Sequence, residues 1–242
     1  MTKREKRKAK RAIELVPELV KAPPRKKVVL KARNFRQRRL LAALKDDSQK
    51  IVFASGPAGT GKTYVSTIFA VQQLQEKSIE RLVITRPAVS VDEQHGFLPG
   101  TIEDKMAPWL GPILDCLGEY YRPDEIKQLI QDKVIEIAPL AYMRGRTFKN
   151  AIIILDESQN TTPSQMQMIT TRIGEGSRLF VTGDGAQFDR GYEKNGLADI
   201  IRRISQVPSD LIAHIMFTED EVERSEIVAE MVQIYNNNPD AY

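Results

Sequence analysis

The chain has 242 residues, enough for one substantial hydrophobic core, and a net charge of +4. Its single cysteine excludes an intramolecular disulfide and fits a reducing compartment. No apolar run approaches the roughly 18–20 residues of a membrane span, and the first ten residues lack the apolar core of a signal peptide, so we expect a cytoplasmic protein with no membrane partner.

Residues 1–33 are strongly basic. They contain thirteen Lys or Arg against three Glu, a net charge of +10, which leaves −6 for the rest of the chain. Pro23 and Pro24 would interrupt a helix there. We interpret 1–33 as a flexible N-terminal tail ahead of a single domain over 34–242. A run of one charge sign is either simply solvated or neutralises nucleic-acid phosphates, and both interpretations stay open.

From residue 34 on, apolar runs alternate with helix-like segments. We predict helices over 61–77, from Pro163 with Thr161 or Thr162 as the N-cap, and over 221–237. A long irregular stretch up to about residue 131 contains the amphipathic segment 102–121. The predicted strands are 50–55, 81–85, 134–139, 151–156, 178–184 and 210–217. Strand alternating with helix predicts an α/β fold, a parallel sheet with helices on both faces.

The segment GPAGTGKT at 56–63 follows the first strand and opens the first long helix. It fits the P-loop pattern in the expected context. Its glycines let the backbone wrap around phosphates, Lys62 reaches the outer phosphates, and the Thr63 hydroxyl can ligate magnesium. We therefore predict ATP and Mg²⁺ as ligands. The predicted ATP-binding residues here are Gly56, Pro57, Ala58, Gly59, Thr60, Gly61, Lys62, Thr63 and Tyr64.

Two carboxylates, Asp156 and Glu157, directly follow the apolar strand 151–155. Alone, they could simply reach solvent where the strand stops. A P-loop protein, however, needs a second strand whose end delivers a carboxylate to the magnesium. We therefore predict Asp156 as a metal ligand and Glu157 as the residue that polarises the attacking water.

Two glutamines have weaker signals. Gln187 lies in VTGDGAQFD, at the end of another apolar run, and could sense the terminal phosphate; the alternative is a polar turn. Gln37 precedes Gly56 by 19 residues and could read the adenine edge through its amide. As an isolated residue it would be an ordinary surface glutamine.

Six segments in order resemble the PhoH family of ATPases: GPAGTGKTY, TRPAV, GFLPG, PLAYMRGRTF, LDESQNTTPSQMQMITTRIGEGS and VTGDGAQFD. The similarity runs from about Gln37 to about Tyr235. It implies a RecA-like P-loop NTPase core related to the first motor domain of superfamily one helicases, in a family that is also common among bacteriophages. The resemblance assigns the roles above to Gln37, Lys62, Thr63, Asp156, Glu157 and Gln187. The chain departs from the family by reading DESQ for the usual DEAQ, and in the segment after Gln187.

Only about 50 residues follow the GDxxQ element, too few for a second RecA-like domain. We therefore expect a homo-oligomer, a ring with a hexamer favoured, whose sites are completed by an arginine from a neighbouring subunit. Arg224 matches a C-terminal arginine of the family, although a surface ion pair is the alternative. Arg144 and Arg146 are further candidates, either for this role or for nucleic-acid contact, with a structural salt bridge as the alternative.

The sequence thus predicts a magnesium-dependent ATPase, catalytic through Lys62, Glu157, Gln187 and Arg224, and coupled to single-stranded nucleic acid, RNA more than DNA. A non-enzymatic alternative is an ATP-gated assembly module without strand separation. A small-molecule phosphotransferase on the same loop is a third possibility, against which the DESQ and GDxxQ elements argue.

Overall fold

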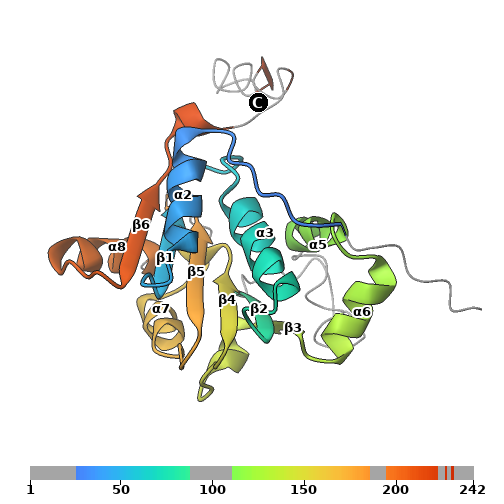
Figure 1. The fold of residues 1–242 in the computed structure, drawn as a ribbon. Coiled ribbons are helices and arrows are strands. Elements are labelled where there is room, and N and C mark those ends of the chain that lie inside the picture. Colours follow the sequence, from blue (N-terminus) through green and yellow to red (C-terminus); the bar gives the residue numbers. More distant parts are fainter. Residues whose placement is uncertain (1–25, 88–110, 186–194, 223–226, 228–229, 232–242) are drawn as a thin grey trace, which may run out of the picture.

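The computed structural model describes residues 26–87, 111–185, 195–222, 227, 230 and 231. Its six strands form one parallel sheet in the order β3-β2-β4-β5-β1-β6 (Figure 1). The strands are β1 (Ile51–Ser55), β2 (Arg81–Arg86), β3 (Ile135–Pro139), β4 (Ala151–Leu155), β5 (Arg178–Gly183) and β6 (Ile212–Met216). All six predicted strands are confirmed, and so is the parallel α/β architecture.

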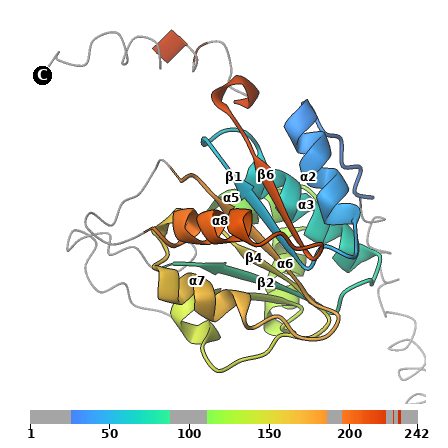
Figure 2. The same cartoon turned by 90° about the vertical axis from the view of Figure 1, so that its left-hand side faces the viewer.

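Helices cover both faces of this sheet. One face packs against α2 (Phe35–Lys45), α3 (Lys62–Gln75), α5 (Gly111–Gly118) and α6 (Pro123–Gln131). The other packs against α7 (Pro163–Thr170) and α8 (Gly196–Gln206), which lie side by side in Figure 2. Short 3₁₀ turns are η2 (Leu140–Met143), η3 (Ser158–Asn160) and η4 (Glu219–Glu221). Among the described helices, none is both long and apolar enough to cross a membrane.

The predicted helix starts are tested by α3 and α7. Helix α3 begins at Lys62, within the predicted segment. Helix α7 begins at Pro163, and Thr162 rather than Thr161 is its N-cap: the Thr162 hydroxyl accepts from the Gln165 N–H at 3.2 Å, and the Gln165 side chain accepts from the Thr162 N–H at 2.9 Å. This reciprocal pair is a capping box. Most of the predicted helix over 221–237 lies outside the described residues, and its first residue belongs to η4.

The described part of the basic segment lies against the body of the protein. Val28 is 5% exposed and belongs to the hydrophobic core on the α3 face. The Lys26 ammonium lies 5.4 Å from the centre of the Tyr120 ring. The boundary predicted at residue 33 remains a prediction, but Val28 contributes to the same core as the helices that follow it.

Helix α2 was not predicted, and a buried arginine fixes its C-terminal end. Arg178, the first residue of β5, donates to the carbonyl oxygens of Leu44 at 2.6 Å, Ala43 at 3.1 Å and Asp46 at 2.9 Å. Its Nε also donates to the Gln49 carbonyl at 2.8 Å. Because the last carbonyls of a helix lack intrahelical partners, this guanidinium supplies the donors that α2 needs and ties the helix to the sheet.

Arg178→Lys should therefore lower the free energy of unfolding by about 2–3 kcal/mol, because a lysine ammonium cannot reach four carbonyls in this fork geometry and buried acceptors are left unpaired. Urea unfolding followed by circular dichroism measures the change. Arg203→Lys on the exposed face of α8 is the matched control and should leave the midpoint where it is. Equal midpoints for the two variants would contradict the capping role.

Candidate active site

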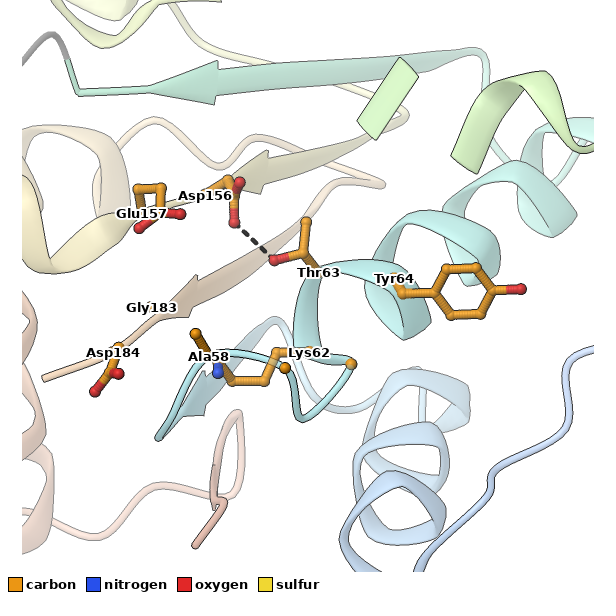
Figure 3. A pocket seen from close by; sticks show the side chains of 10 residues that line it. Ala58, Lys62, Thr63, Tyr64, Asp156, Glu157, Gly183 and Asp184 are labelled. Atoms are coloured by element: carbon orange, nitrogen blue, oxygen red, sulfur yellow. Dashed lines mark hydrogen bonds between the residues drawn. The ribbon is translucent and has the colours of Figure 1, made fainter. Parts of the chain in front are cut away.

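A cavity of about 250 Å³ opens where β1, β4 and β5 end and α3 begins (Figure 3). In a parallel sheet the carboxyl ends of the strands meet at one edge, which is the usual place for a ligand. The lining residues are Ala58, Gly59, Gly61, Lys62, Thr63, Tyr64, Asp156, Glu157, Gly183 and Asp184. The structure thus brings the predicted P-loop and the predicted carboxylate pair to one cavity.

The P-loop connects β1 to α3 in a conformation that depends on its glycines. Gly56, Gly59 and Gly61 have φ angles of 132°, 82° and 82°, which side-chain-bearing residues rarely adopt. A Cβ on Gly56 would also lie 2.3 Å from the carbonyl oxygen of Phe217, just beyond β6. The turn places the start of α3 beside the cavity, and because the first N–H groups of a helix lack intrahelical partners, this placement suits an anion.

Lys62 is 7% exposed, and its ammonium is folded back into the loop. It donates to the carbonyl oxygens of Gly56 at 2.7 Å and Pro57 at 2.6 Å, and to the Thr60 hydroxyl at 3.1 Å. Burial lowers its pKa, while the nearby carboxylates, first Asp184, oppose that shift. A phosphate in the cavity would offer oxygens that replace these carbonyl partners.

Thr63 and Asp156 form the polar centre of the cavity, joined by the dashed line in Figure 3. The Thr63 hydroxyl donates to Asp156 Oδ1 at 2.8 Å, and the Thr182 hydroxyl donates to the same oxygen at 2.7 Å. Hydroxyl and carboxylate oxygens are hard ligands that suit Mg²⁺, so these residues fit the predicted ion. Among the described residues, no group of three or more His, Cys, Asp or Glu could hold a metal.

Glu157 lies at the rim of the cavity and is held from two sides. Its backbone is left-handed, with φ 50° and ψ 41°. Arg86 at the end of β2 approaches Glu157 Oε1 at 3.3 Å, and the Gln159 side-chain amide donates to Oε2. Gln159 Oε1 in turn accepts from the backbone N–H of Asp184 at 3.0 Å.

Arg86 and Gln159 are site residues that the sequence interpretation missed. Both stand in segments quoted for the family resemblance, TRPAV and DESQ, but no role was assigned to either. The available signal for Arg86 was its position directly after a predicted strand, and Asp156 was found by the same kind of position. Gln159 is 1% exposed and reaches β5 only because Gly183 has no side chain: a Cβ there would lie 2.7 Å from Gln159 Oε1 and 2.5 Å from Ser158 Oγ.

Gln37 supports the P-loop from behind. It is 4% exposed, its amide donates to the Thr60 carbonyl at 3.0 Å, and its Oε1 accepts from the Arg33 N–H at 2.9 Å. It does not belong to the residues that line the described cavity. The amide that was expected to read adenine is thus engaged with backbone groups, and the adenine role remains a prediction.

Tyr64 lines the cavity, but its ring points away from Thr63 and Asp156 in Figure 3. Its hydroxyl donates to Glu119 at 3.1 Å. Burial, and then this carboxylate, raise the pKa of Tyr64 to about 12. The phenol therefore stays protonated at neutral pH and acts as a donor to Glu119, the residue after α5.

The remaining candidates that the structure describes, Arg144 and Arg146, are not among the residues that line this cavity. Gln187 and Arg224 lie outside the described residues. Arg144 is exposed. Arg146 forms a two-point ion pair with Glu136 on the edge strand β3, and its guanidinium lies 4.6 Å from the centre of the Phe148 ring. That pair holds the pKa of Glu136 below its usual value, so the structural salt bridge is the arrangement observed for Arg146.

The chain is similar to several known proteins. A model of the PhoH-like protein family matches residues 29–236. The PhoH-like protein of Synechocystis sp. is 40% identical over 226 residues, 93% of this chain and 68% of that protein. For the PhoH-like protein of Bacillus subtilis the identity is 42% over 209 residues, 86% of this chain and 64% of that protein. Protein PhoH of Escherichia coli K12 is 38% identical over 209 residues, 85% of this chain and 58% of that protein.

The chain therefore spans 58–68% of the length of these relatives. Among solved structures, the large terminase of a thermophilic bacteriophage, in complex with ADP, superposes with a TM-score of 0.51 at 13% identity, over 82% of this chain and 48% of that chain. The likeness is one of fold, the α/β fold of P-loop NTPases with a RecA-like sheet. With a family model that covers most of its length, the chain belongs to the PhoH-like protein family.

Proposed function

We propose that the chain is a magnesium-dependent ATP hydrolase. The observation that carries the proposal is the hydrogen bond of 2.8 Å between Thr63, in the first turn of α3, and Asp156, at the end of β4. It joins the P-loop to the carboxylate of a second strand. A nucleoside triphosphate with its metal needs both the P-loop hydroxyl and this carboxylate, whereas a simple anion-binding loop does not need the carboxylate.

The residues predicted from the sequence then have separate roles in hydrolysis. The N–H groups of the P-loop and the Lys62 ammonium bind the phosphates, and Thr63 and Asp156 hold the ion. When bound, Mg²⁺ neutralises charge on the outer phosphates. Glu157 orients the attacking water and accepts its proton. Gln187 follows β5 and is assigned the terminal phosphate, as the family resemblance implies.

Preference for ATP is assigned to Gln37. Its contact with the Thr60 carbonyl places it directly behind the P-loop. Its side-chain amide has two N–H groups and two acceptor lone pairs, so it could bind a base edge with the second of each while it keeps its contacts with Thr60 and Arg33. Adenine binding would then be connected to the P-loop through the hydrogen bond between Gln37 and Thr60.

We also propose that turnover is coupled to single-stranded nucleic acid, RNA more than DNA, in the cytoplasm. Support comes from the net charge of +10 on residues 1–33, which favours binding that depends on salt and not on base sequence. The resemblance to helicase motor domains points the same way.

A homo-oligomeric ring, with a hexamer favoured, is the proposed assembly. Because Arg146 is paired with Glu136, it is poorly placed to donate to a neighbour's phosphates without breaking that pair. Arg224 is therefore the preferred arginine from the neighbouring subunit, and Arg144, which is exposed, is assigned to nucleic-acid contact.

The first prediction for this site is steady ATP turnover that requires magnesium and is stimulated by single-stranded RNA at low salt. EDTA should abolish it, and Glu157→Gln should reduce kcat by about 10²–10⁴-fold while ATP still binds. Phosphate release with and without RNA or DNA measures both. Turnover that both polymers leave unchanged would contradict coupling, and a nucleotide-dependent change of mass would then favour an assembly module. Turnover equal in wild type and Glu157→Gln would contradict the hydrolase.

A second prediction concerns the end of β5. Gly183→Ala should lower kcat by about 10- to 100-fold, because its methyl group would displace Gln159 and Ser158 beside Glu157. Gly185→Ala is the matched control, since a Cβ there meets no atom of the described residues within 4 Å. The same turnover in both variants, each folded by circular dichroism, would show that this close approach is unimportant.

A third prediction concerns the basic segment. Changing the nine Lys and Arg of residues 1–25 to Gln in the full chain should weaken RNA binding most at low salt. The slope of log affinity against log salt should fall by about 0.7 for each phosphate that the protein no longer neutralises. Fluorescence anisotropy across a salt series measures it, with turnover in the absence of RNA as the control. An unchanged slope would mean that this segment is merely solvated.

A further inference from the structure

Glu157 directly follows β4, and its carboxylate is held by contacts that come from the two β-strands next to β4. In the sheet, β4 lies between β2 and β5. From β2, Arg86 contacts Oε1 at 3.3 Å. From the other side, Gln159 donates to Oε2 and accepts from the Asp184 N–H at the end of β5. Both oxygens that could face an attacking water are therefore engaged by protein groups.

The two contacts differ in strength. Gln159 is 1% exposed and is enclosed by the Gly183 backbone, so its amide has a fixed position. The side chains of Arg86 and Glu157 are 23% and 35% exposed, and ion pairs in such partly solvated positions are weak and easily exchanged. The contact with Arg86 is consequently the one that a competing anion can break.

The backbone at Glu157 adds a reason for restraint. A left-handed conformation, φ 50° and ψ 41°, is uncommon for a residue with a side chain and persists when its surroundings hold it. Such strain at a reactive carboxylate fits a residue that is kept in one orientation and reoriented during turnover. Arg86 is the exchangeable part of what holds it.

We propose that Arg86 is a positioning residue that restrains Glu157 in a resting orientation, and that a phosphate of a bound nucleic-acid strand pairs with Arg86 and releases it. The inference rests on the proposed function. A guanidinium matches phosphate as well as carboxylate in its fork geometry. Arg86 is partly exposed at the same sheet edge as the cavity, so an outside phosphate can reach it without opening the core. The bound nucleic acid would thereby control hydrolysis through the ion pair between Arg86 and Glu157.

The test is Arg86→Ala, with Arg81→Ala at the opposite end of the same strand as the matched control. Without polymer, Arg86→Ala should raise kcat about two- to fivefold, the size expected for a weak ion pair, with KM for ATP unchanged. Stimulation by a poly(U) oligonucleotide should shrink by the same factor. Arg86→Lys, which keeps the charge, should restore part of the restraint. Arg81→Ala should behave as wild type.

A double variant shows whether the effect passes through Glu157. In the Glu157→Gln background, Arg86→Ala should give no gain in kcat, because no carboxylate remains to be released. A fall in kcat for both Arg86→Ala and Arg86→Lys, with KM unchanged, would overturn the restraint. A raised KM for ATP in Arg86→Ala would indicate that Arg86 contacts ATP, and it would overturn the proposed release by nucleic acid. If wild type itself does not hydrolyse ATP, the proposed function fails first; if it does, only these outcomes bear on Arg86.

Discussion

A single carboxylate oxygen connects the parts of this protein that matter for its chemistry. Asp156 is 6% exposed, and its Oδ1 accepts from Thr63 on α3 and from Thr182 on β5. Because an ionised carboxylate in a buried position must be compensated by donors, the helix and both strands are held in one arrangement. The position of the P-loop relative to β4 follows from that requirement, and so does the shape of the cavity between them.

Much of the fold could be predicted because the strands are continuous apolar runs. Segments such as Ala151–Leu155 are buried on both faces, and a short apolar run between turns favours that arrangement. The sequence interpretation overlooked α2, α8 and α6, the last of which lies in a stretch interpreted as irregular. Helix α2 carries three arginines, Arg36, Arg38 and Arg39, near its start, and the donor at its C-terminal end, Arg178, lies more than 130 residues away in sequence. Helix α8 could have been predicted, because its apolar residues recur at helical spacing: Leu197, Ile200, Ile201 and Ile204.

The site divides in the same way. Lys62, Thr63 and Asp156 could be predicted because each occupies a position that local chemistry defines, a loop after a strand or the end of a strand. The contacts of Arg86 and Gln159 could not be predicted, because they depend on which strands are neighbours. Alternation of strand and helix gives parallel strands but not the order β2-β4-β5, and only that order places Arg86 and Asp184 on the two sides of Glu157.

Two kinds of polar contact therefore meet at this edge of the sheet. The bonds of Asp156 with Thr182 and of Gln159 with Asp184 are buried, so breaking them leaves unpaired groups in the interior and costs far more than their formation contributes. The contacts of Lys62 with loop carbonyls, and of Arg86 with Glu157, involve cations whose partners a phosphate can replace. A site that must bind and release anions repeatedly needs both kinds. The buried hydrogen bonds preserve the geometry of the site while anions bind and leave, and the Lys62 and Arg86 side chains are the groups that change partners.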